Sequence, residues 1–315
     1  MPDLIDLTPA ELAAFTRKYA LSGPPERVPS VGIVNRVYRA HWSGQVVALR
    51  VPLPGDHEDT LTESVAVPAA VRAGVRTPEL LVFDNDRDVL DAPMTIYAWA
   101  QGRSLDAFGW VPGDPRLGLA WREAGRELAR LHAGVRVVDD PNGWLDTAQG
   151  AVPERTLKRV TDTRRLGQQD AQWAVDTVRR LLHDAPLPAS VFLHNDLHAG
   201  NLMVTDEGAV TALIDWGDAA WGDPVIDLCY AGPLAAPELL RGYLEAAPGA
   251  LGNGGTLRLL AYLLDDATRR LAIPPEDYTA DLWYTRPGTA LMQLLRIAPL
   301  FPQWDAYLGS GPTAR

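Results

Sequence analysis

The chain has 315 residues, of which 47% are hydrophobic and 22% charged, so it can bury the core of one large domain or two smaller ones. Its formal net charge of −11 argues against a nucleic-acid partner, which would need a basic face, and is compatible with a cationic small substrate. A single cysteine excludes an internal disulfide, and no apolar run approaches the length of a membrane span.

The N-terminal segment has the pattern of a helix start. Thr8 and Glu11 have the spacing of a capping box, with Pro9 at the first helical position. Leu12 and Phe15 then share one apolar face. This start does not read as a signal peptide. Together with the single cysteine it favours a cytoplasmic protein without a membrane partner.

The next part of the chain, up to about residue 99, combines strand and helix patterns. Residues 31–42 and 45–51 are strand-like on either side of a Ser43-Gly44 turn, and residues 58–73 have a helical pattern. Two further strands are expected at residues 80–83 and 94–99. This part therefore predicts a small, mostly antiparallel sheet with one main helix.

Helical patterns dominate after residue 102. The expected helices cover residues 121–132, 157–182, 257–271 and 289–297, and only the stretch 191–215 reads as strand. We therefore expect an α+β fold with two lobes. Residues 1–97 would form a small mixed lobe, residues 98–102 a linker, and residues 103–315 a mainly helical lobe. A cleft between two lobes is the usual place for a ligand.

A predicted hairpin brings two oxygen-bearing side chains together. Asn201 precedes a short apolar strand, Asp206-Glu207-Gly208 is a strong turn signal, and Asp215 ends the returning strand. An antiparallel pair would place Asn201 and Asp215 at the same end of the hairpin. An amide oxygen and a carboxylate are suitable ligands for Mg²⁺, which would bridge nucleotide phosphates.

The residues just before this hairpin supply a candidate base. Asp196 lies five residues before Asn201 and could accept a proton from a substrate hydroxyl. We expect His194 to pack and hydrogen-bond within the loop, whereas His198 could either approach phosphate oxygens or order the loop. A surface hairpin with ordinary turn acids is the alternative reading. The combination of H-x-D-x-x-x-x-N with I-D-W-G-D is much more specific than that.

At these residues the chain resembles the aminoglycoside phosphotransferase family. That family is part of the protein-kinase-like superfamily, with choline, homoserine and fructosamine kinases. The resemblance covers residues 29–221 and is strongest in the block 194–218. It implies a bilobal protein-kinase-like fold and a transfer of phosphate from ATP, with Mg²⁺, to a small-molecule hydroxyl. By motif position Asp196 matches the catalytic aspartate, Asn201 and Asp215 match the metal ligands, and Asp227 would brace the catalytic loop.

The N-terminal matches to this family are looser. Gly32 lies in a loop that could lay backbone N–H groups over phosphates. Arg50 stands on the strand where relatives carry a phosphate-binding lysine, and its fork can also bind phosphate oxygens. Glu63 matches the helix carboxylate that would pair with Arg50. Because Pro68 should kink or shorten that helix, Glu58 stays open as a substitute.

The linker and the helical lobe carry the remaining candidates. Backbone groups of Ala98 and Ala100 would contact the adenine. Acceptor selection is expected after the catalytic block, from acids and aromatic rings that suit a cationic compound. The candidates are Asp265, Asp266, Glu276, Asp277, Asp281, Trp283 and Tyr284. Arg269 and Arg270 could neutralise these carboxylates, and solvated helix acids are the simpler reading for any one of them.

The leading functional hypothesis is a phosphotransferase that acts on an aminoglycoside-type antibiotic. A metabolite kinase for homoserine, choline or ethanolamine, or a sugar has the same motifs. A non-catalytic nucleotide-binding pseudokinase is the third reading, which the presence of Asp196, Asn201 and Asp215 argues against. The motifs do not distinguish ATP from GTP, identify the acceptor hydroxyl, or indicate an oligomeric state.

Overall fold

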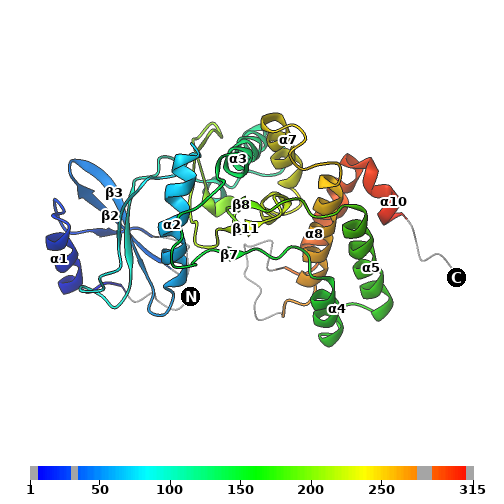
Figure 1. The fold of residues 1–315 in the computed structure, drawn as a ribbon, viewed down its shortest axis with the longest axis horizontal. Helices are drawn as coiled ribbons and strands as arrows, with labels where there is room; N and C mark the ends of the chain where they lie inside the picture. Colours follow the sequence, from blue (N-terminus) through cyan, green and yellow to red (C-terminus); the bar gives the residue numbers. More distant parts are fainter. Residues whose placement is uncertain (1–5, 30–34, 275–285, 310–315) are drawn as a thin grey trace.

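The computed structural model describes residues 6–29, 35–274 and 286–309, and it has the expected α+β, bilobal protein-kinase-like fold (Figure 1). A five-stranded sheet in the order β1-β2-β3-β5-β4 forms the smaller part, and all its strand pairs are antiparallel. The strands are β1 (Glu26–Arg27), β2 (Asn35–Trp42), β3 (Gln45–Pro52), β4 (Leu80–Asp84) and β5 (Met94–Ala98).

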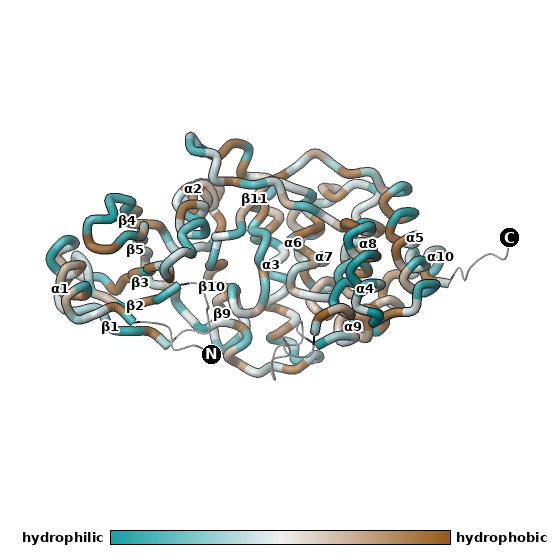
Figure 2. Tube along the Cα trace, turned by 90° about the horizontal axis from the view of Figure 1, so that it is seen from below, coloured by the Kyte–Doolittle hydropathy of each residue, from teal (hydrophilic) through white to brown (hydrophobic). Residues whose placement is uncertain are grey.

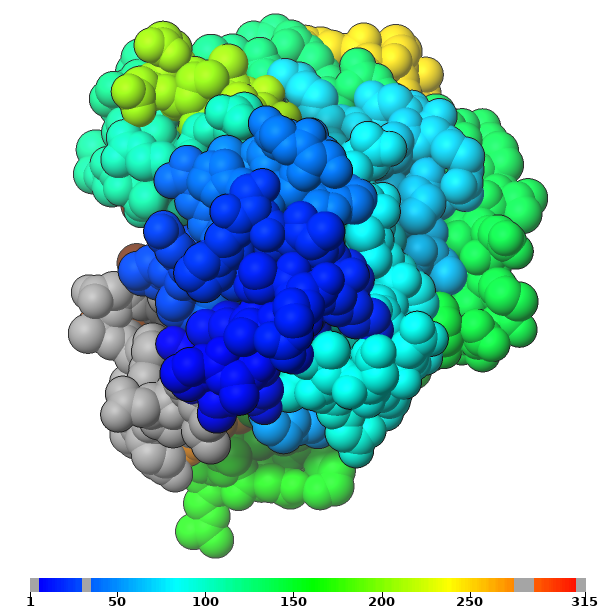
Figure 3. All heavy atoms as spheres, turned by 90° about the vertical axis from the view of Figure 1, so that its left-hand side faces the viewer, coloured from blue at the N-terminus to red at the C-terminus, as the bar shows by residue number. Residues whose placement is uncertain are grey.

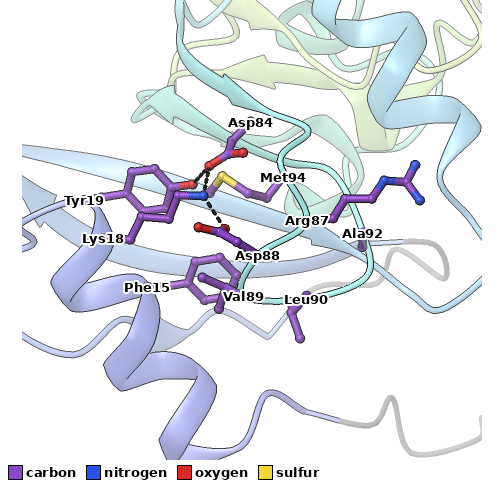
Figure 4. Close-up of a pocket in the computed structure, with 10 residues that line it drawn as sticks. All are labelled: Phe15, Lys18, Tyr19, Asp84, Arg87, Asp88, Val89, Leu90, Ala92 and Met94. Atoms are coloured by element: carbon purple, nitrogen blue, oxygen red, sulfur yellow. Dashed lines mark hydrogen bonds and ion pairs between the residues drawn. The ribbon is translucent and has the colours of Figure 1, made fainter.

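Helix α1 (Pro9–Lys18) begins at the predicted capping box, in which the Thr8 hydroxyl accepts from the Glu11 N–H and the Glu11 carboxylate accepts from the Thr8 N–H. Figure 3, which views the left-hand side of Figure 1, shows the N-terminal residues in dark blue at the front of this end of the molecule. Lys18 pairs with Asp84 at 2.6 Å and also with Asp88, while the Tyr19 hydroxyl donates to Asp84 (Figure 4). The cavity beside these groups is only about 10 Å³, so this contact clamps the helix and holds no ligand.

Helix α2 (Glu58–Arg72) is the main helix of the N-terminal part. Pro68 was expected to kink or shorten this helix, and the shortening does not occur, because the helix continues for another turn to Arg72. Proline removes one helix hydrogen bond. The apolar face around it, which includes Val67 and Ala70, is fully buried, and this burial outweighs the loss.

The larger part is mainly helical. Its helices are α3 (Pro115–Gly134), α4 (Pro153–Asp162), α5 (Gln168–Asp184), α6 (Val225–Tyr230), α7 (Ala236–Ala246), α8 (Gly255–Arg270), α9 (Thr289–Ile297) and α10 (Asp305–Leu308). Its strands are β6 (Arg103–Ser104), β7 (Asp146–Thr147), β8 (Val191–Leu193), β9 (Leu202–Val204), β10 (Val210–Leu213) and β11 (Ala220–Gly222), in two three-stranded sheets ordered β10-β9-β6 and β7-β11-β8. Short 3-10 turns cover Leu105–Phe108, Ala199–Asn201, Ala298–Leu300 and Pro302–Trp304.

The single helix expected at residues 157–182 is wrong, because the chain forms α4 and α5 there. Between them Arg164 has a φ of 53° and Gly167 precedes the first turn of α5. This break allows α4 to fold back, so that Val160 and Ala171 are buried together with Ala272. The apolar periodicity of the two helices runs on through the break, which explains the error.

Two hydrophobic cores hold the molecule together. The smaller core lies between α1 and the five-stranded sheet. The larger one joins the helices of the C-terminal part and also includes the apolar face of α2. Teal and brown segments alternate along α5 and α8, as expected for helices with one buried face (Figure 2). Among the described residues, no helix combines the length and apolar character needed to cross a bilayer.

Candidate active site

The β9–β10 hairpin places Asn201 and Asp215 at the same end. Leu202 pairs with Leu213, and the next residues are joined by a hydrogen bond of 3.0 Å from the Ile214 N–H to the Asn201 carbonyl. The turn at the other end closes with Gly208 at a φ of 88°, where L-residues are strained. The spacing read from the sequence therefore corresponds to a real pairing of the two strands.

Asp215 leaves the hairpin in an unusual conformation, with a φ of 68°. The following Trp216 is buried and its indole N–H donates to the Thr77 hydroxyl at 3.0 Å. A Cβ on Gly217 would lie 2.5 Å from the Cβ of Asp59, so α2 packs directly against this turn. These contacts fix the loop that carries Asp215.

Asp196 and Asn201 are in direct contact. The Asn201 side-chain amide donates to both the carbonyl (2.9 Å) and the Oδ2 (2.8 Å) of Asp196. Burial, with the charges of Asp218 and Asp215, raises the pKa of Asp196 to about 7. A carboxyl group with such a pKa can take up a proton near neutral pH.

Several carboxylates share this region. Burial and the charge of Asp218 raise the pKa of Asp59, and burial and the charge of Asp215 raise the pKa of Asp218. Asp215 differs, because the Arg50 guanidinium outweighs the effect of burial and lowers its pKa. The mutual repulsion of these acids makes the site attractive to a cation. Sequence reasoning missed Asp59, because nothing in its helix distinguishes it from an ordinary solvated acid.

The catalytic loop is held from behind by Asp227 at the start of α6. Its carboxylate, fully buried, accepts the backbone N–H groups of His194 (2.9 Å) and Asn195 (2.7 Å). His132 of α3 contacts the same carboxylate at 3.0 Å through Nε2 and the Tyr243 hydroxyl of α7 at 3.1 Å through Nδ1. These contacts agree with the bracing role expected for Asp227. His132 and Tyr243 had no signal in the sequence.

The two histidines of the loop have different surroundings. His194 is buried, packs on Trp216 with ring centroids 4.5 Å apart, and donates from Nε2 to the Ile214 carbonyl at 3.1 Å. Burial lowers its pKa, so the ring is neutral and structural. His198 accepts from the Gly200 N–H at 3.0 Å through Nδ1, and its Nε2 lies 3.7 Å from Oδ2 of Asp196.

Arg50 connects the sheet to α2 and to the hairpin. Its guanidinium pairs with Glu63 through Nη1 and with Asp215 through Nη2, the latter at 2.8 Å. Glu63 also accepts from the Tyr97 hydroxyl at 2.7 Å, and burial raises the pKa of Glu63 to about 7. Of the two carboxylates left open by the sequence, Glu63 rather than Glu58 therefore contacts Arg50. Tyr97, just before the linker, makes a side-chain contact that the sequence did not indicate.

The linker is attached to the hairpin. A Cβ on Gly102 would lie 2.3 Å from the Val204 carbonyl oxygen, and the Thr211 hydroxyl donates to the Gln101 carbonyl at 2.6 Å. The Ala98 N–H donates to the Glu79 carbonyl at 2.9 Å. The Ala98 N–H is therefore not available to an adenine, whereas the Ala100 N–H makes no hydrogen bond to the described part of the chain.

Some predicted residues cannot be assessed. Gly32 lies outside the described residues, as do the acceptor candidates Glu276, Asp277, Asp281, Trp283 and Tyr284. Of the other two acceptor candidates, Asp265 is buried and accepts from the Val152 N–H, and Asp266 pairs with Arg269 and Arg270. The neutralisation considered for these acids therefore applies to Asp266.

The donors at the hairpin end fit a magnesium ion. Within the described ranges, no group of three or more His, Cys, Asp or Glu side chains is arranged as a metal site. The Asn201–Asp215 pair differs from such a group, because it offers one amide oxygen and one carboxylate. The Asn201 amide nitrogen is directed at Asp196, so its carbonyl oxygen faces away, and the Asp215 side chain is 41% exposed. Mg²⁺ commonly takes one or two such oxygens and completes its shell with phosphate oxygens and water.

Comparison with known proteins identifies the family. A family model described as the phosphotransferase enzyme family matches residues 26–262. The chain belongs to this family. The resemblance inferred from the block 194–218 is confirmed, and this member of the phosphotransferase family is an enzyme that transfers a phosphoryl group to a hydroxyl acceptor.

Solved structures of similar fold cover nearly all of the chain. A choline/ethanolamine kinase family protein from Mesorhizobium loti is 23% identical, with a TM-score of 0.58 over 95% of this chain and 96% of that one. A thermostable mutant of aminoglycoside phosphotransferase APH(4)-Ia, in complex with ADP and hygromycin B, is 16% identical, with a TM-score of 0.55 over 96% and 99%.

Spectinomycin phosphotransferase APH(9)-Ia, in complex with ADP and spectinomycin, is 14% identical, with a TM-score of 0.56 over 92% and 93%. No curated protein sequence matches this family member. At these identities the solved structures show a similar fold. Their substrates cannot be assigned to this chain on that basis.

Proposed function

We propose that the protein transfers the γ-phosphoryl group of ATP, with Mg²⁺, to a hydroxyl of a small cationic molecule, with an aminoglycoside-type antibiotic as the leading acceptor. The observation that carries this proposal is the convergence of Asp196, Asn201 and Asp215 at one end of the β9–β10 hairpin. A base and two oxygen donors beside each other are what this reaction needs.

Each residue has a distinct proposed role. Asp196 accepts the proton of the acceptor hydroxyl and aims its oxygen, and a pKa of about 7 suits that task. Asn201 and Asp215 would hold the cation. Arg50, oriented by Glu63, would bind phosphate oxygens. Bound Mg²⁺ would supply neutralisation of the phosphate charge.

The nucleotide would lie along the linker and the sheet. The adenine would contact the Ala98 carbonyl and the Ala100 N–H. The loop at Gly32 would cover the phosphates. This arrangement is supported by the ADP complexes of proteins with a similar fold.

The acidic surroundings of Asp196 support a cationic acceptor. After burial, the charge of Asp218 raises the pKa of both Asp59 and Asp196, and an ammonium group would relieve this repulsion. The likeness to APH(4)-Ia with hygromycin B supports an aminoglycoside, which would make the protein an antibiotic-resistance enzyme. The likeness to the choline/ethanolamine kinase family protein supports a small amino alcohol as the second candidate.

A panel of acceptors tests the proposal. Purified protein is incubated with ATP, Mg²⁺ and, in turn, aminoglycosides, choline, ethanolamine, homoserine and sugars, and ADP release is measured. We expect turnover with an aminoglycoside and a loss of roughly 10²- to 10⁴-fold in kcat for Asp196→Asn, because the positioned base is removed. Asp206→Asn in the exposed hairpin turn is the matched control and should leave kcat unchanged.

The other outcomes distinguish the alternatives. Turnover confined to choline or another metabolite would replace the antibiotic with that acceptor. Nucleotide binding in a thermal shift without turnover of any acceptor would favour the pseudokinase reading. Wild-type kcat in Asp196→Asn would refute the role of Asp196.

A further inference from the structure

Asn195, next to the proposed base, has the backbone conformation that L-residues generally avoid. Its φ is 63°, in the left-handed region, and Asp215 on the opposite loop has a φ of 68°. Asparagine is among the few non-glycine residues that adopt this region readily. Two such residues, one on each of these loops, indicate that both loops are held in defined positions.

The contacts of Asn195 join the two loops. Its backbone N–H donates to Oδ1 of Asp227 at 2.7 Å, which ties it to α6. Its side-chain amide donates to the Asp218 carbonyl at 2.9 Å, three residues beyond Asp215. In this left-handed conformation Asn195 makes both hydrogen bonds at once. Its backbone contacts Asp227 of α6, and its side chain contacts the loop that carries Asp215.

The loop that carries Asp215 is thereby held on both sides. Before Asp215, the Ile214 N–H donates to the Asn201 carbonyl, and the Ile214 carbonyl accepts from His194. After Asp215, the Asn195 side chain holds the Asp218 carbonyl. This bond adds to the contacts of Trp216 and Gly217 that fix the loop, and it ties the loop directly to the residue beside Asp196.

We propose that Asn195 is a positioning residue for phosphoryl transfer, whose side-chain amide sets the distance between the base and the loop that carries the metal-binding carboxylate. This inference rests on the proposed function. According to this proposal, the position needs the asparagine side chain as well as a residue that tolerates the left-handed backbone. Glycine at this position would keep the conformation and lose the bond to Asp218, so the two requirements can be separated.

The experiment compares Asn195→Gly with the wild-type chain and with Asn142→Gly, a matched control in an exposed turn away from the site. The first measurement is the melting temperature with ADP at increasing Mg²⁺, which reports metal binding without turnover. The second is the split between kcat and KM for ATP with the acceptor found in the panel. Asn195→Asp, which tolerates the same backbone but lacks the donor, is the second variant.

We expect Asn195→Gly to fold with a melting temperature near that of the wild type. Its Mg²⁺ concentration for half-maximal stabilisation should rise roughly 10-fold and its kcat should fall roughly 10-fold, as when a residue that orients a metal ligand is lost. The KM for ATP should change by less than about twofold, because the contacts of the nucleotide with the linker and the sheet are intact. Asn142→Gly should match the wild type in every measurement.

Wild-type Mg²⁺ dependence and kcat in Asn195→Gly would overturn the inference. A lower melting temperature alone, with unchanged Mg²⁺ dependence, would also overturn it, because the side chain would then be only structural. If the wild type turns over no acceptor, the proposed function fails, and the Mg²⁺ titration still decides the role of Asn195. Absence of any Mg²⁺ effect in the wild type would overturn both.

Discussion

Arg50 contacts two carboxylates with the two ends of its guanidinium group. A lysine ammonium is a point charge on a flexible stem, whereas the guanidinium is a planar fork that can bind two carboxylates at once. Here one nitrogen pairs with Glu63 and the other with Asp215. The arginine therefore holds Asp215, the carboxylate that we propose binds the metal, in place before a nucleotide arrives. Its charge also offsets two acids, of which Glu63 is almost fully buried.

Removing this guanidinium should destabilise the fold. Arg50→Met leaves Glu63 buried without its cation, and we expect a loss of about 3 kcal/mol in the free energy of unfolding by urea titration. Glu63→Gln in the same chain should recover part of the loss, because no buried charge then remains unpaired. Arg103→Met is the control, since its ion pair with Asp206 is exposed and should cost less than about 1 kcal/mol. Equal losses for the two arginine variants would contradict this account.

Residues within one short segment of the chain were the easiest to place from the sequence. Asn201 and Asp215 flank a hairpin, so counting residues from the turn at Glu207 was enough to bring them together. Tyr97 and Asp59 reach the site from distant elements, and only the packing of α2 brings them there. Asn195 carried no signal, because its role depends on a backbone angle.

Among the elements, α3 and α7 approach each other unusually closely. A Cβ on Gly242 would lie 1.8 Å from the Arg122 carbonyl oxygen, and one on Gly125 would lie 2.1 Å from the Leu239 carbonyl oxygen. The two glycines therefore permit a backbone-to-backbone contact between the helices. This contact supports the catalytic loop, because α3 and α7 carry His132 and Tyr243.

Filling this contact should force the helices apart. We expect Gly242→Ala to lower the free energy of unfolding by about 3 kcal/mol, at the upper end of the cost of overpacking. Gly118→Ala is the control. Gly118 lies on the same helix α3, where a Cβ would be at an ordinary 3.9 Å from the Glu238 side chain. It should instead stabilise by about 0.5 to 1 kcal/mol, because alanine favours the helix. Urea titration of both variants measures this, and a loss in Gly118→Ala would indicate that helix α3 tolerates no added volume.

The same pair of helices should show a pH-dependent contribution to stability. Hydrogen bonds from Arg122 and Arg126 lower the pKa of Glu245 to about 2 from an ordinary value of 4.5. Because the folded state favours the charged form, this stabilisation is present above pH 4.5 and is lost as the pH falls from 4.5 toward 2. We expect the difference in melting temperature between the wild type and Glu245→Gln to shrink over that range. Glu207→Gln in the exposed turn is the control, and a constant difference for Glu245→Gln would refute the linkage.

Elements with clear end signals were predicted well, and those without were not. The capping box at Thr8 and Glu11 marked the start of α1 correctly. The break between α4 and α5 was missed, because the left-handed angle of Arg164 has no local signal and accompanies the burial of Val160 and Ala171 against Ala272. Pro68 does not end α2, because burial of the surrounding apolar face outweighs the hydrogen bond that proline removes.

At the scale of the whole molecule, two separate cores predict two levels of stability. Phe15 of α1 is buried in the smaller core, and Phe192 of β8 in the larger one. Phe15→Ala should cost about 3 to 5 kcal/mol. We expect it to accelerate hydrogen exchange of amides in β2 and β3 far more than those in α8. Phe192→Ala should act mainly on α8, and a uniform acceleration in both variants would indicate a single cooperative unit.

The two-lobe arrangement itself was predictable because the change from strand to helix patterns near residue 100 survives any local error. What the sequence did not indicate is that α2 belongs to the larger core. Its residues Ala66 and Ala70 pack with the C-terminal helices, although the chain enters and leaves α2 through the sheet.

This sharing of α2 has a mechanical consequence. Arg50 stands on β3 between Leu49 and Val51, which belong to the smaller core, whereas Glu63 stands on a helix anchored in the larger one. Any tilt of the sheet against the helical body must stretch or compress the link between these two side chains. The Arg50–Glu63 ion pair therefore bridges the two cores and links the sheet directly to the helical part of the molecule.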